Sequence, residues 1–391
     1  MPGASFSLAS LAYMALLLVG AAEAHLKPVP RFHHKSEIVN GHLCVYGGKS
    51  HGTGTNLTDF LIDHRCVDVT KSIDRKDPFW KDLRSSSQFT MPPLAQHSSV
   101  YDRLNHVIVP YGGQTVVGFS AVNRMSVFCS MYQAWGASTF IDSAPRRYTH
   151  TAVLQERSGD MIIFGGASDE TTNGQGFARW TNPIRMVLDS YRHSHYARIL
   201  GKDDTPVKAS TIKEDDGEAP PAGISQVNQH AAVIFNDKDM VIVGGSVWEQ
   251  DTSTAINVPM DKIHVYDVDA RTWSTHKCSG QVPPGRGAMP GSRYKDSLFI
   301  FGGVNVSNWG MLYNDLYMLN TSTWTWKRMP TPGAPTERYA HDMKTLGHYL
   351  IITNGFLGNQ GDEGIYFYDI KRESFVDTYS PDGISREDLD V

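Results

Sequence analysis

Positive charge is scarce in this chain. It has 391 residues, with 36 lysines and arginines against 41 aspartates and glutamates, which gives a formal net charge of −5. A protein that binds nucleic acid strongly needs clustered cationic charge, so this balance argues against a nucleic-acid partner. Hydrophobic residues make up 40% and charged residues 20% of the chain, which is typical of a globular protein rather than a disordered one.

Cysteine and known catalytic motifs are also sparse. The chain has four cysteines and no C-x-x-C pair, which argues against a zinc ribbon or a thioredoxin-like site. A Walker loop, a serine nucleophile elbow and an H-E-x-x-H motif are all missing. We therefore predict no cofactor, no metal and no catalytic residue, and we regard enzymatic activity as unproven by the sequence.

A long apolar run occurs only near the N-terminus. Residues 6–22 are apolar, and the small residues Ala22-Glu23-Ala24 follow in the pattern that a signal peptidase recognises. Residues 1–10 carry no lysine or arginine, so a signal anchor is the alternative. We predict a signal peptide over 1–24, a secreted product and no membrane span after cleavage.

Two further features agree with export. Asn56, Asn305 and Asn320 each begin a glycosylation sequon. An even number of cysteines suits an oxidising compartment, and four cysteines allow three pairings. Because Cys44 and Cys66 lie in what we expect to be neighbouring strands, we predict a disulfide between them.

Glycine is more frequent than usual, and much of it occurs in doublets. Each doublet ends a short apolar segment, and successive doublets are about 50 to 80 residues apart. The five doublets are Gly47-Gly48, Gly112-Gly113, Gly165-Gly166, Gly244-Gly245 and Gly302-Gly303. Asn354-Gly355 is a degenerate sixth copy. Glycine permits a positive φ and a close backbone approach, so these residues are predicted to be structural.

A histidine precedes most of the doublets. These histidines are His34, His97, His150, His230 and His341, and three of them end an Arg-x-x-His sequence. The fifth unit keeps Arg286 but has Met289 at the histidine position. After each doublet come a polar loop, an alternating strand and an aromatic strand, most clearly over 262–273.

These residues together resemble the kelch repeat. The resemblance implies an all-β, kelch-type β-propeller with four antiparallel strands per blade. We count six blades, or seven if an insertion hides one. The predicted propeller covers residues 25–383, with units starting near 31, 92, 146, 224, 285 and 336, and residues 384–391 are predicted to form a polar C-terminal tail.

Four arginines are the candidates for ligand binding. Arg31, Arg147, Arg286 and Arg338 begin the same strand in four units, so closure of the propeller would bring them near one end of its channel. A partial ring of guanidinium groups could hold a carboxylate or a sugar acid by paired hydrogen bonds. The alternative is that each arginine bonds backbone carbonyls and has a structural role only.

The function predicted from this pattern is binding. We expect a secreted propeller that recognises an extracellular protein or a glycan, of unknown oligomeric state, through the loops of one face. The alternative is an enzyme that acts on a carbohydrate or a small acid at the channel mouth, similar to a mutarotase. A copper oxidase similar to galactose oxidase is less favoured, because the chain lacks the Tyr-His dipeptide of that family.

Overall fold

The computed structural model describes most of the chain after the predicted leader. The described residues are 26, 29–50, 60–82, 90–115, 121–131, 133–136, 139–140, 146–168, 178–179, 183–187, 212–214, 217–249, 254–308 and 310–389. The predicted signal peptide lies outside them. Among them, no helix is long and apolar enough to cross a membrane.

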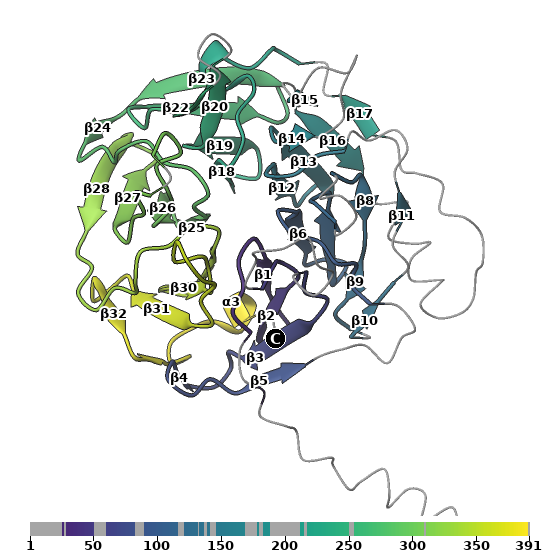
Figure 1. The fold of residues 1–391 in the computed structure, drawn as a ribbon, viewed down its shortest axis with the longest axis vertical. Coiled ribbons are helices and arrows are strands. Elements are labelled where there is room, and N and C mark those ends of the chain that lie inside the picture. The colour runs from purple at the N-terminus through teal and green to yellow at the C-terminus, as the bar shows by residue number, and fades with distance from the viewer. Residues whose placement is uncertain are drawn as a thin grey trace, which may run out of the picture.

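Six antiparallel sheets surround one axis (Figure 1). The first blade contains β1 (Lys35–Val39), β2 (His42–Tyr46), β3 (His64–Asp68) and β5 (Trp80–Asp82). The second contains β6 (Ser98–Asp102), β7 (Val107–Tyr111), β8 (Arg124–Met125), β9 (Phe128–Cys129), β10 (Ala134–Trp135) and β11 (Thr139–Phe140). The third contains β12 (Thr151–Gln155), β13 (Asp160–Phe164), β16 (Ile184–Val187) and β17 (Ile212–Glu214).

The remaining three blades follow the same order. The fourth contains β18 (Ala231–Phe235), β19 (Asp239–Val243), β22 (Lys262–Asp267) and β23 (Thr272–Lys277). The fifth contains β25 (Gly291–Tyr294), β26 (Ser297–Phe301), β27 (Leu316–Asn320) and β28 (Thr325–Met329), with β24 (Ser279–Gly280) parallel to β28. The sixth contains β29 (Asp342–Leu346), β30 (Tyr349–Thr353), β31 (Ile365–Asp369) and β32 (Ser374–Val376).

Two short hairpins and two helical turns lie outside the six blade sheets. The hairpins are β14 (Ala167–Ser168) with β15 (Ala178–Arg179) and β20 (Ser246–Glu249) with β21 (Thr254–Asn257). The helical turns are η3 (Ala222–Ile224) and α3 (Arg386–Leu389).

The hydrophobic core is divided among the blade interfaces. Each of six buried clusters joins two neighbouring blades, including one that joins the sixth blade to the first. In that last cluster Leu43 and Val45 of β2 share the core with Ile351 of β30 and Phe367 of β31. The second strand of a blade, for example β13 in the third blade and β30 in the sixth, is buried along its whole length. Each face of such a strand packs against a neighbouring blade. The predicted propeller is confirmed with six blades, and the alternative of a seventh is wrong.

The two ends of the described chain meet at the first blade. β33 (Thr378–Tyr379) pairs with β4 (Ile73–Asp74), and Tyr379 is fully buried and donates a hydrogen bond to the carbonyl oxygen of Val69 at 2.8 Å. The amide of Gly41 donates to the carbonyl of Leu389, whose side chain joins the core. Residues 384–389 are thus docked on the first blade, which the prediction of a polar tail did not anticipate.

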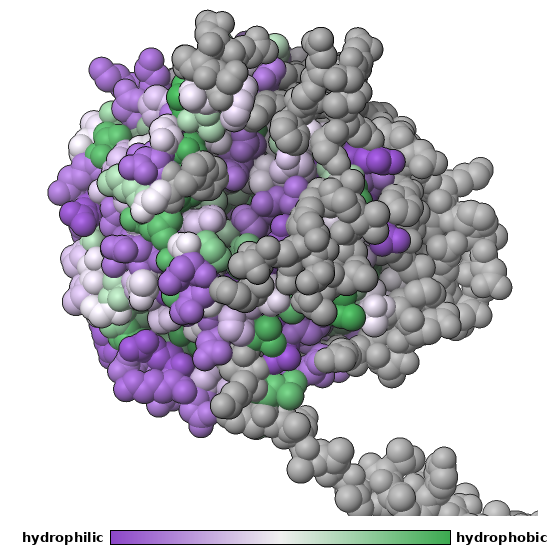
Figure 2. Space-filling model, viewed as in Figure 1, coloured by the Kyte–Doolittle hydropathy of each residue, from purple (hydrophilic) through white to green (hydrophobic). Residues whose placement is uncertain are grey.

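The face of the disc seen in Figure 2 is a mosaic of hydropathy. Hydrophilic side chains gather along the lower left of the rim, over β32 and β4, and the hydrophobic residues on the coloured part of this face are scattered. Single exposed apolar residues of this kind are normal on a protein surface and do not by themselves mark an interface.

Candidate functional site

A pocket of about 90 Å³ lies on the axis of the propeller. Its position follows from its lining, because every one of the six blades contributes residues to it. Each blade contributes them from the segment just before its innermost strand. These residues are His33, Gln96, Thr149, Gln229, Ala288 and Ala340, each followed by the histidine or methionine of its unit. We call this feature the axial pocket.

A closed ring of backbone hydrogen bonds surrounds the axial pocket. The same six residues adopt left-handed φ angles of 54–57°. The amide of each one donates to the carbonyl of the equivalent residue in the preceding blade, at 2.8–3.0 Å. The bond from His33 to Ala340 closes the circle between the first and last blades. We call these six bonds the first ring.

A second closed ring runs through the glycine doublets. In every blade, the amide of the second doublet residue donates to a backbone carbonyl of the following blade at 2.8–2.9 Å. The acceptors are the carbonyls of Leu94, Arg147, Val227, Arg286, Arg338 and Arg31. The donors are Gly48, Gly113, Gly166, Gly245, Gly303 and Gly355. Only the backbone is needed here, so Leu94 and Val227 replace arginine without interrupting this second ring.

The histidines pack directly against the first glycine of the preceding doublet. A Cβ atom placed on Gly112 would lie 2.7 Å from Cε1 of His150, and one on Gly165 would lie 2.7 Å from Cε1 of His230. In the fifth blade Met289 fills the same space against Gly244. Glycine and histidine therefore recur together because the ring of one blade occupies the volume that a side chain on the previous blade would need.

Burial keeps these histidines neutral. Desolvation lowers the pKa of His97, His230 and His341 to about 3, and lowers the pKa of His34 and His150 well below its usual value. Hydroxyls of the adjacent blade bond the Nε2 atoms of three of them: Thr353 to His34, Ser98 to His150 and Thr151 to His230, at 2.6–3.0 Å. The deeper part of the axial pocket thus presents uncharged imidazoles.

The mouth of the axial pocket is polar but almost uncharged. Gln96, Thr149 and Gln229 supply amides and a hydroxyl, and Gln96 also contacts the ring of His33 at 3.2 Å. Lys35 is the one charged lining residue among those that the structure describes, and its ammonium group lies 3.9 Å from Asp342. The described lining of this pocket includes no arginine, carboxylate or tyrosine.

The four candidate arginines do not line this pocket. Each of these residues is at most 1% exposed, and each guanidinium donates to the carbonyl of the first doublet residue of its own blade. Arg31 also pairs with Asp63 at 2.6 Å, Arg286 with Asp315 and Arg338 with Asp362. Such bidentate and backbone contacts hold the blade loops together. The prediction that Arg31, Arg147, Arg286 and Arg338 hold a ligand is therefore not supported, and their contacts match the structural alternative.

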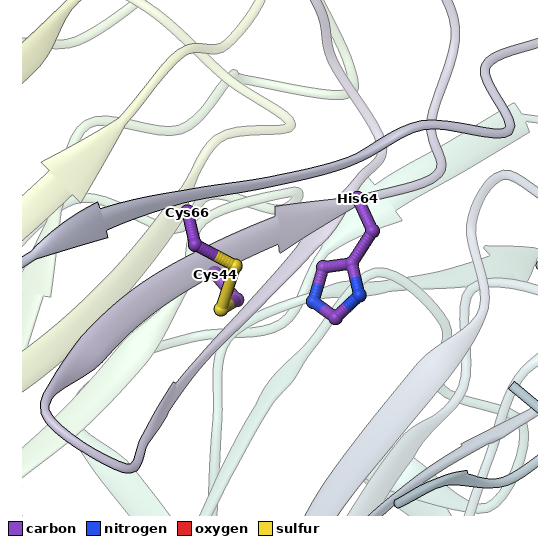
Figure 3. Close-up of side chains that lie close together, drawn as sticks. All are labelled: Cys44, His64 and Cys66. Carbon is purple, nitrogen blue, oxygen red and sulfur yellow. A yellow bond between two sulfur atoms is a disulfide. The ribbon is translucent and has the colours of Figure 1, made fainter. Parts of the chain in front are cut away.

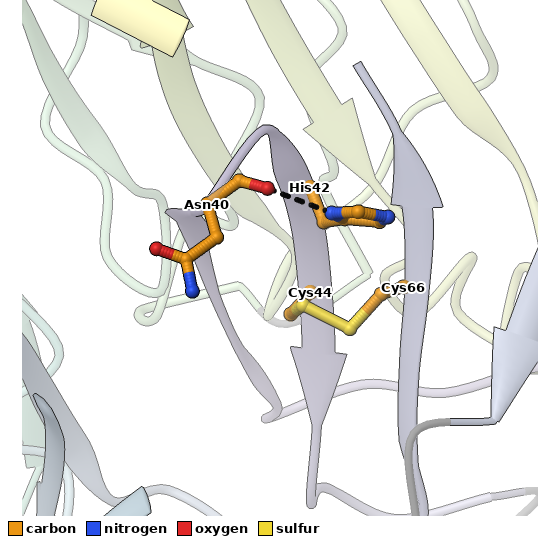
Figure 4. Close-up of a disulfide and its surroundings, with 4 residues drawn as sticks. All are labelled: Asn40, His42, Cys44 and Cys66. Carbon is orange, nitrogen blue, oxygen red and sulfur yellow. Dashed lines mark hydrogen bonds between the residues drawn. A yellow bond between two sulfur atoms is a disulfide. The ribbon is translucent and has the colours of Figure 1, made fainter. Parts of the chain in front are cut away.

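The predicted disulfide is present. Cys44 of β2 and Cys66 of β3 lie directly opposite each other and are bonded (Figure 4). At the adjoining β1–β2 turn, the ring of His42 bonds the carbonyl of Asn40 at 2.9 Å. Cys129 and Cys278 are buried cysteines outside this disulfide. The pairing was found from the sequence because both cysteines lie on strands that the repeat places side by side.

His64 lies beside this disulfide (Figure 3). With Cys44 and Cys66 it forms the one cluster of possible metal ligands among the described residues. The two sulfurs are bonded to each other and so are not free thiolates, which metal binding would require. The imidazole packs against Phe128 and Trp135, and burial lowers its pKa to about 3. The arrangement is that of a packed core histidine.

Two of the three sequons fall within the described residues. Asn320 is the last residue of β27, and its Oδ1 accepts the amides of Ser322 and Thr323 in the following turn at 3.0 Å. Asn305 is half-buried, and its Oδ1 accepts bonds from Asn257 and Ser307. Asn56 lies outside the described residues, as does most of the long insertion between Gly166 and His230.

Comparison with known proteins agrees with this geometry. The KLHDC2/KLHL20/DRC7 Kelch-repeats domain matches residues 221–383. The fold is a six-bladed kelch-type β-propeller. Kelch domain-containing protein 3 of Homo sapiens is 30% identical over 216 residues, which cover 55% of this chain and 50% of that protein.

Two other relatives extend the comparison. A Kelch repeat-containing protein of Arthroderma benhamiae is 26% identical over 402 residues, 90% of this chain and 57% of that protein. Acyl-CoA-binding domain-containing protein 4 of Arabidopsis thaliana is 25% identical over 303 residues, 73% of this chain and 40% of that protein. The chain spans about half the length of the curated relatives that it matches. The family model and the two kelch relatives agree with the kelch-type propeller fold described above.

Proposed function

We propose that this kelch propeller is a secreted binding module that recognises an extracellular protein or a glycan at the face containing the axial pocket. One observation carries the proposal. At the six equivalent positions of the first ring the backbone has the structural role, since Ala288 and Ala340 occupy two of them with the same φ and the same bonds. The polar side chains of Gln96, Thr149 and Gln229 are therefore not needed for closure. The Thr149 hydroxyl donates to the carbonyl oxygen of Tyr148 at 2.7 Å, and it can still accept a hydrogen bond from a ligand.

The chemistry of the mouth favours a neutral polar group. Amide and hydroxyl side chains can each donate and accept hydrogen bonds, which suits a peptide amide or a sugar hydroxyl. A pocket of about 90 Å³ is small beside the several hundred cubic ångströms of a typical small-molecule site, so it would receive only part of a larger ligand. The rest of the contact would come from the surrounding loops, as is common on rigid scaffolds.

The natural alanines in the ring supply the test. In the variant Gln96→Ala/Thr149→Ala/Gln229→Ala, all six positions except His33 would carry alanine, so the ring bonds should persist. The mature chain and the variant would be compared on a glycan array and in pull-downs from secreted extracts. We expect the variant to keep its Tm and lose at least about tenfold in affinity for the ligand found.

A matched change away from the pocket serves as the control. Lys277 is exposed on the outer strand β23, and Lys277→Ala should leave binding unchanged. Unchanged affinity in the triple variant would show that recognition occurs elsewhere and would refute the proposed site.

Export and glycosylation are parts of the same proposal. When the full chain is expressed in a eukaryotic secretory system, the protein should appear in the culture medium. N-terminal sequencing should show that it begins at His25. Enzymatic removal of N-linked glycans should lower its mass, and Asn320→Gln should remove one glycan because the sequon lies in an outer hairpin turn. Retention of the intact leader in the cell would instead indicate a signal anchor.

A further inference from the structure

A second, larger groove lies at the opposite end of the innermost strands. The axial pocket is formed by residues at the start of these strands, whereas this groove includes Tyr294 at the end of β25 and Thr345 near the end of β29. Its volume is about 490 Å³. Three hairpin turns of the fifth and sixth blades form it together with the docked C-terminal segment, which contributes Gly383 and Asp388. We call it the turn groove.

Three cations line the turn groove without a carboxylate partner. They are Arg293 and Lys295 from the β25–β26 hairpin and Lys371 from the β31–β32 turn. Lysines elsewhere in the same blades, such as Lys327 with Glu373 at 2.6 Å, are ion-paired. In the described part of the chain, none of the three groove cations lies within 4 Å of a carboxylate. Such a cluster is unusual in a protein whose net charge is −5.

The guanidinium of Arg293 is held in place by its own blade and the preceding one. Its Nε donates to the carbonyl of Lys295 at 3.0 Å, and its Cζ lies 5.1 Å from the centre of the Phe235 ring. Its Nη1 also donates to the carbonyl oxygen of Ile234 at 3.5 Å. A guanidinium fixed in this way loses little conformational entropy when it binds an anion, and the N–H groups not used in these two bonds stay available.

The acidic residue in the lining is already occupied. Asp388 accepts a hydrogen bond from the hydroxyl of Ser385 at 2.8 Å, within the turn that begins α3. The lining has three cations against this one carboxylate, so it carries an excess of positive charge. His348 adds a titratable group: burial lowers its pKa, Lys371 and Arg372 lower it further, and Asp369 opposes them.

We propose that the turn groove binds a small ligand with two or more anionic groups, such as sulfates, phosphates or carboxylates on a sugar. Arg293 would pair with one group in bidentate fashion, and Lys295 and Lys371 would neutralise the others. His348 would gain a proton on binding, because a nearby negative charge favours the imidazolium. This site is independent of the axial pocket and goes beyond the function proposed for it.

The proposal is tested by calorimetry with three probes at low and high salt: a sulfated disaccharide, its unsulfated parent and inorganic tripolyphosphate. We expect the wild type to bind at least one anionic probe and not the neutral parent. Tighter binding of the sulfated disaccharide would indicate a sulfated sugar as the ligand, and tighter binding of tripolyphosphate would indicate a phosphate. Lys295→Gln and Lys371→Gln should each weaken binding about fivefold or more, and affinity should fall as salt rises.

Controls separate a built site from general charge attraction. Lys277→Gln removes an exposed lysine of the outer strand β23 and should change affinity less than about twofold. Equal losses in Lys277→Gln and Lys295→Gln, or no binding of either anion by the wild type, would overturn the proposal.

The titration of His348 gives a second measurement that unfolding would not imitate. By NMR its pKa should rise when the anion is added, and binding should strengthen as pH falls through that value. An unchanged His348 pKa in the presence of a bound anion would place the anion elsewhere. The triple variant of the axial pocket should bind the anion like the wild type, so the two proposals can fail separately.

Discussion

At the scale of single residues, the first glycine of each doublet determines how closely two blades approach. Gly302 has a φ of 62°, and a Cβ atom there would lie 2.7 Å from the carbonyl oxygen of Arg338 and 3.0 Å from Cε1 of His341. An L-residue would strain the backbone and also displace the neighbouring blade. The glycine is therefore required on both grounds.

We predict that Gly302→Ala lowers the free energy of unfolding by about 2–4 kcal/mol, measured by urea denaturation. Gly223 is the matched control, because a Cβ atom there meets nothing within 4 Å and its φ is not positive. Gly223→Ala should change stability by less than about 0.5 kcal/mol. Equal effects at the two positions would contradict the packing argument.

The buried histidines make stability dependent on pH. Their pKa is near 6.5 in the unfolded chain and is lowered in the folded one, to about 3 for His97. Below pH 6.5 the unfolded chain therefore binds more protons than the folded chain. The stability that the neutral histidines provide is complete above about pH 6.5 and is lost as pH falls toward 3.

We predict that His97→Met reduces this dependence by about one proton, or about 1.4 kcal/mol per pH unit between pH 6 and 4. Methionine is the natural residue at the equivalent position of the fifth blade, Met289, so it should fit the space. Urea unfolding of the wild type and the variant at a series of pH values measures both slopes. Parallel curves would show that His97 does not contribute.

At the scale of elements, the disulfide ties the second and third strands of the first blade. Cys44 and Cys66 are 22 residues apart, so the bond restricts a loop of moderate length in the unfolded chain. We predict that Cys44→Ala/Cys66→Ala lowers the free energy of unfolding by about 3 kcal/mol. A reductant should lower the free energy of unfolding of the wild type by a similar amount and should not change that of the variant. If the reductant also destabilised the variant, another disulfide would be involved.

The sequence predicts the positions of strands best where a strand ends in a glycine doublet. The Gly-Gly signal, the preceding histidine and the period-two alternation located the second and third strands of most blades. The positions of Gln96, Thr149 and Gln229 in the axial pocket could not be predicted from the sequence. The six equivalent residues share a left-handed backbone conformation, but they belong to four different residue types, so no sequence pattern marks them. The one available signal was position, immediately before each histidine or methionine.

The four arginines show why a recurring residue is ambiguous. The sequence correctly indicated that they are equivalent, yet could not tell whether their guanidinium groups face the axis or the blade. The structure places acidic partners such as Asp63 and Asp315 about 30 residues further on in the same blades. Those carboxylates lie in polar loops without a fixed spacing, so the pairing could not be inferred from the pattern.

At the scale of the whole molecule, closure depends on a short C-terminal segment. Tyr379 is buried against Tyr349 and Phe367 of the sixth blade while its hydroxyl bonds the first. No strong sequence signal marks this segment, because β33 has only two residues and no doublet or histidine accompanies it.

We predict that Tyr379→Ala lowers the free energy of unfolding by about 3–5 kcal/mol, by loss of a large buried side chain at the seam. Tyr379→Phe keeps the ring and removes only the bond to Val69, so its cost should be about 1–2 kcal/mol. Thermal and urea unfolding measure both. If Tyr379→Ala left the free energy of unfolding unchanged, the two closed hydrogen-bond rings would be sufficient to hold the last blade to the first.

Because both hydrogen-bond rings are closed, the junction at which the chain begins and ends is held by the same backbone bonds as the other junctions. The seam between the sixth and first blades contains the same two backbone bonds as every other seam, and both ends of the described chain dock on the first blade. A circular permutant, with a linker joining these ends and new termini opened between two other blades, should therefore rebuild the same disc. In such a permutant the order of the blades along the gene would change while their order around the axis would not.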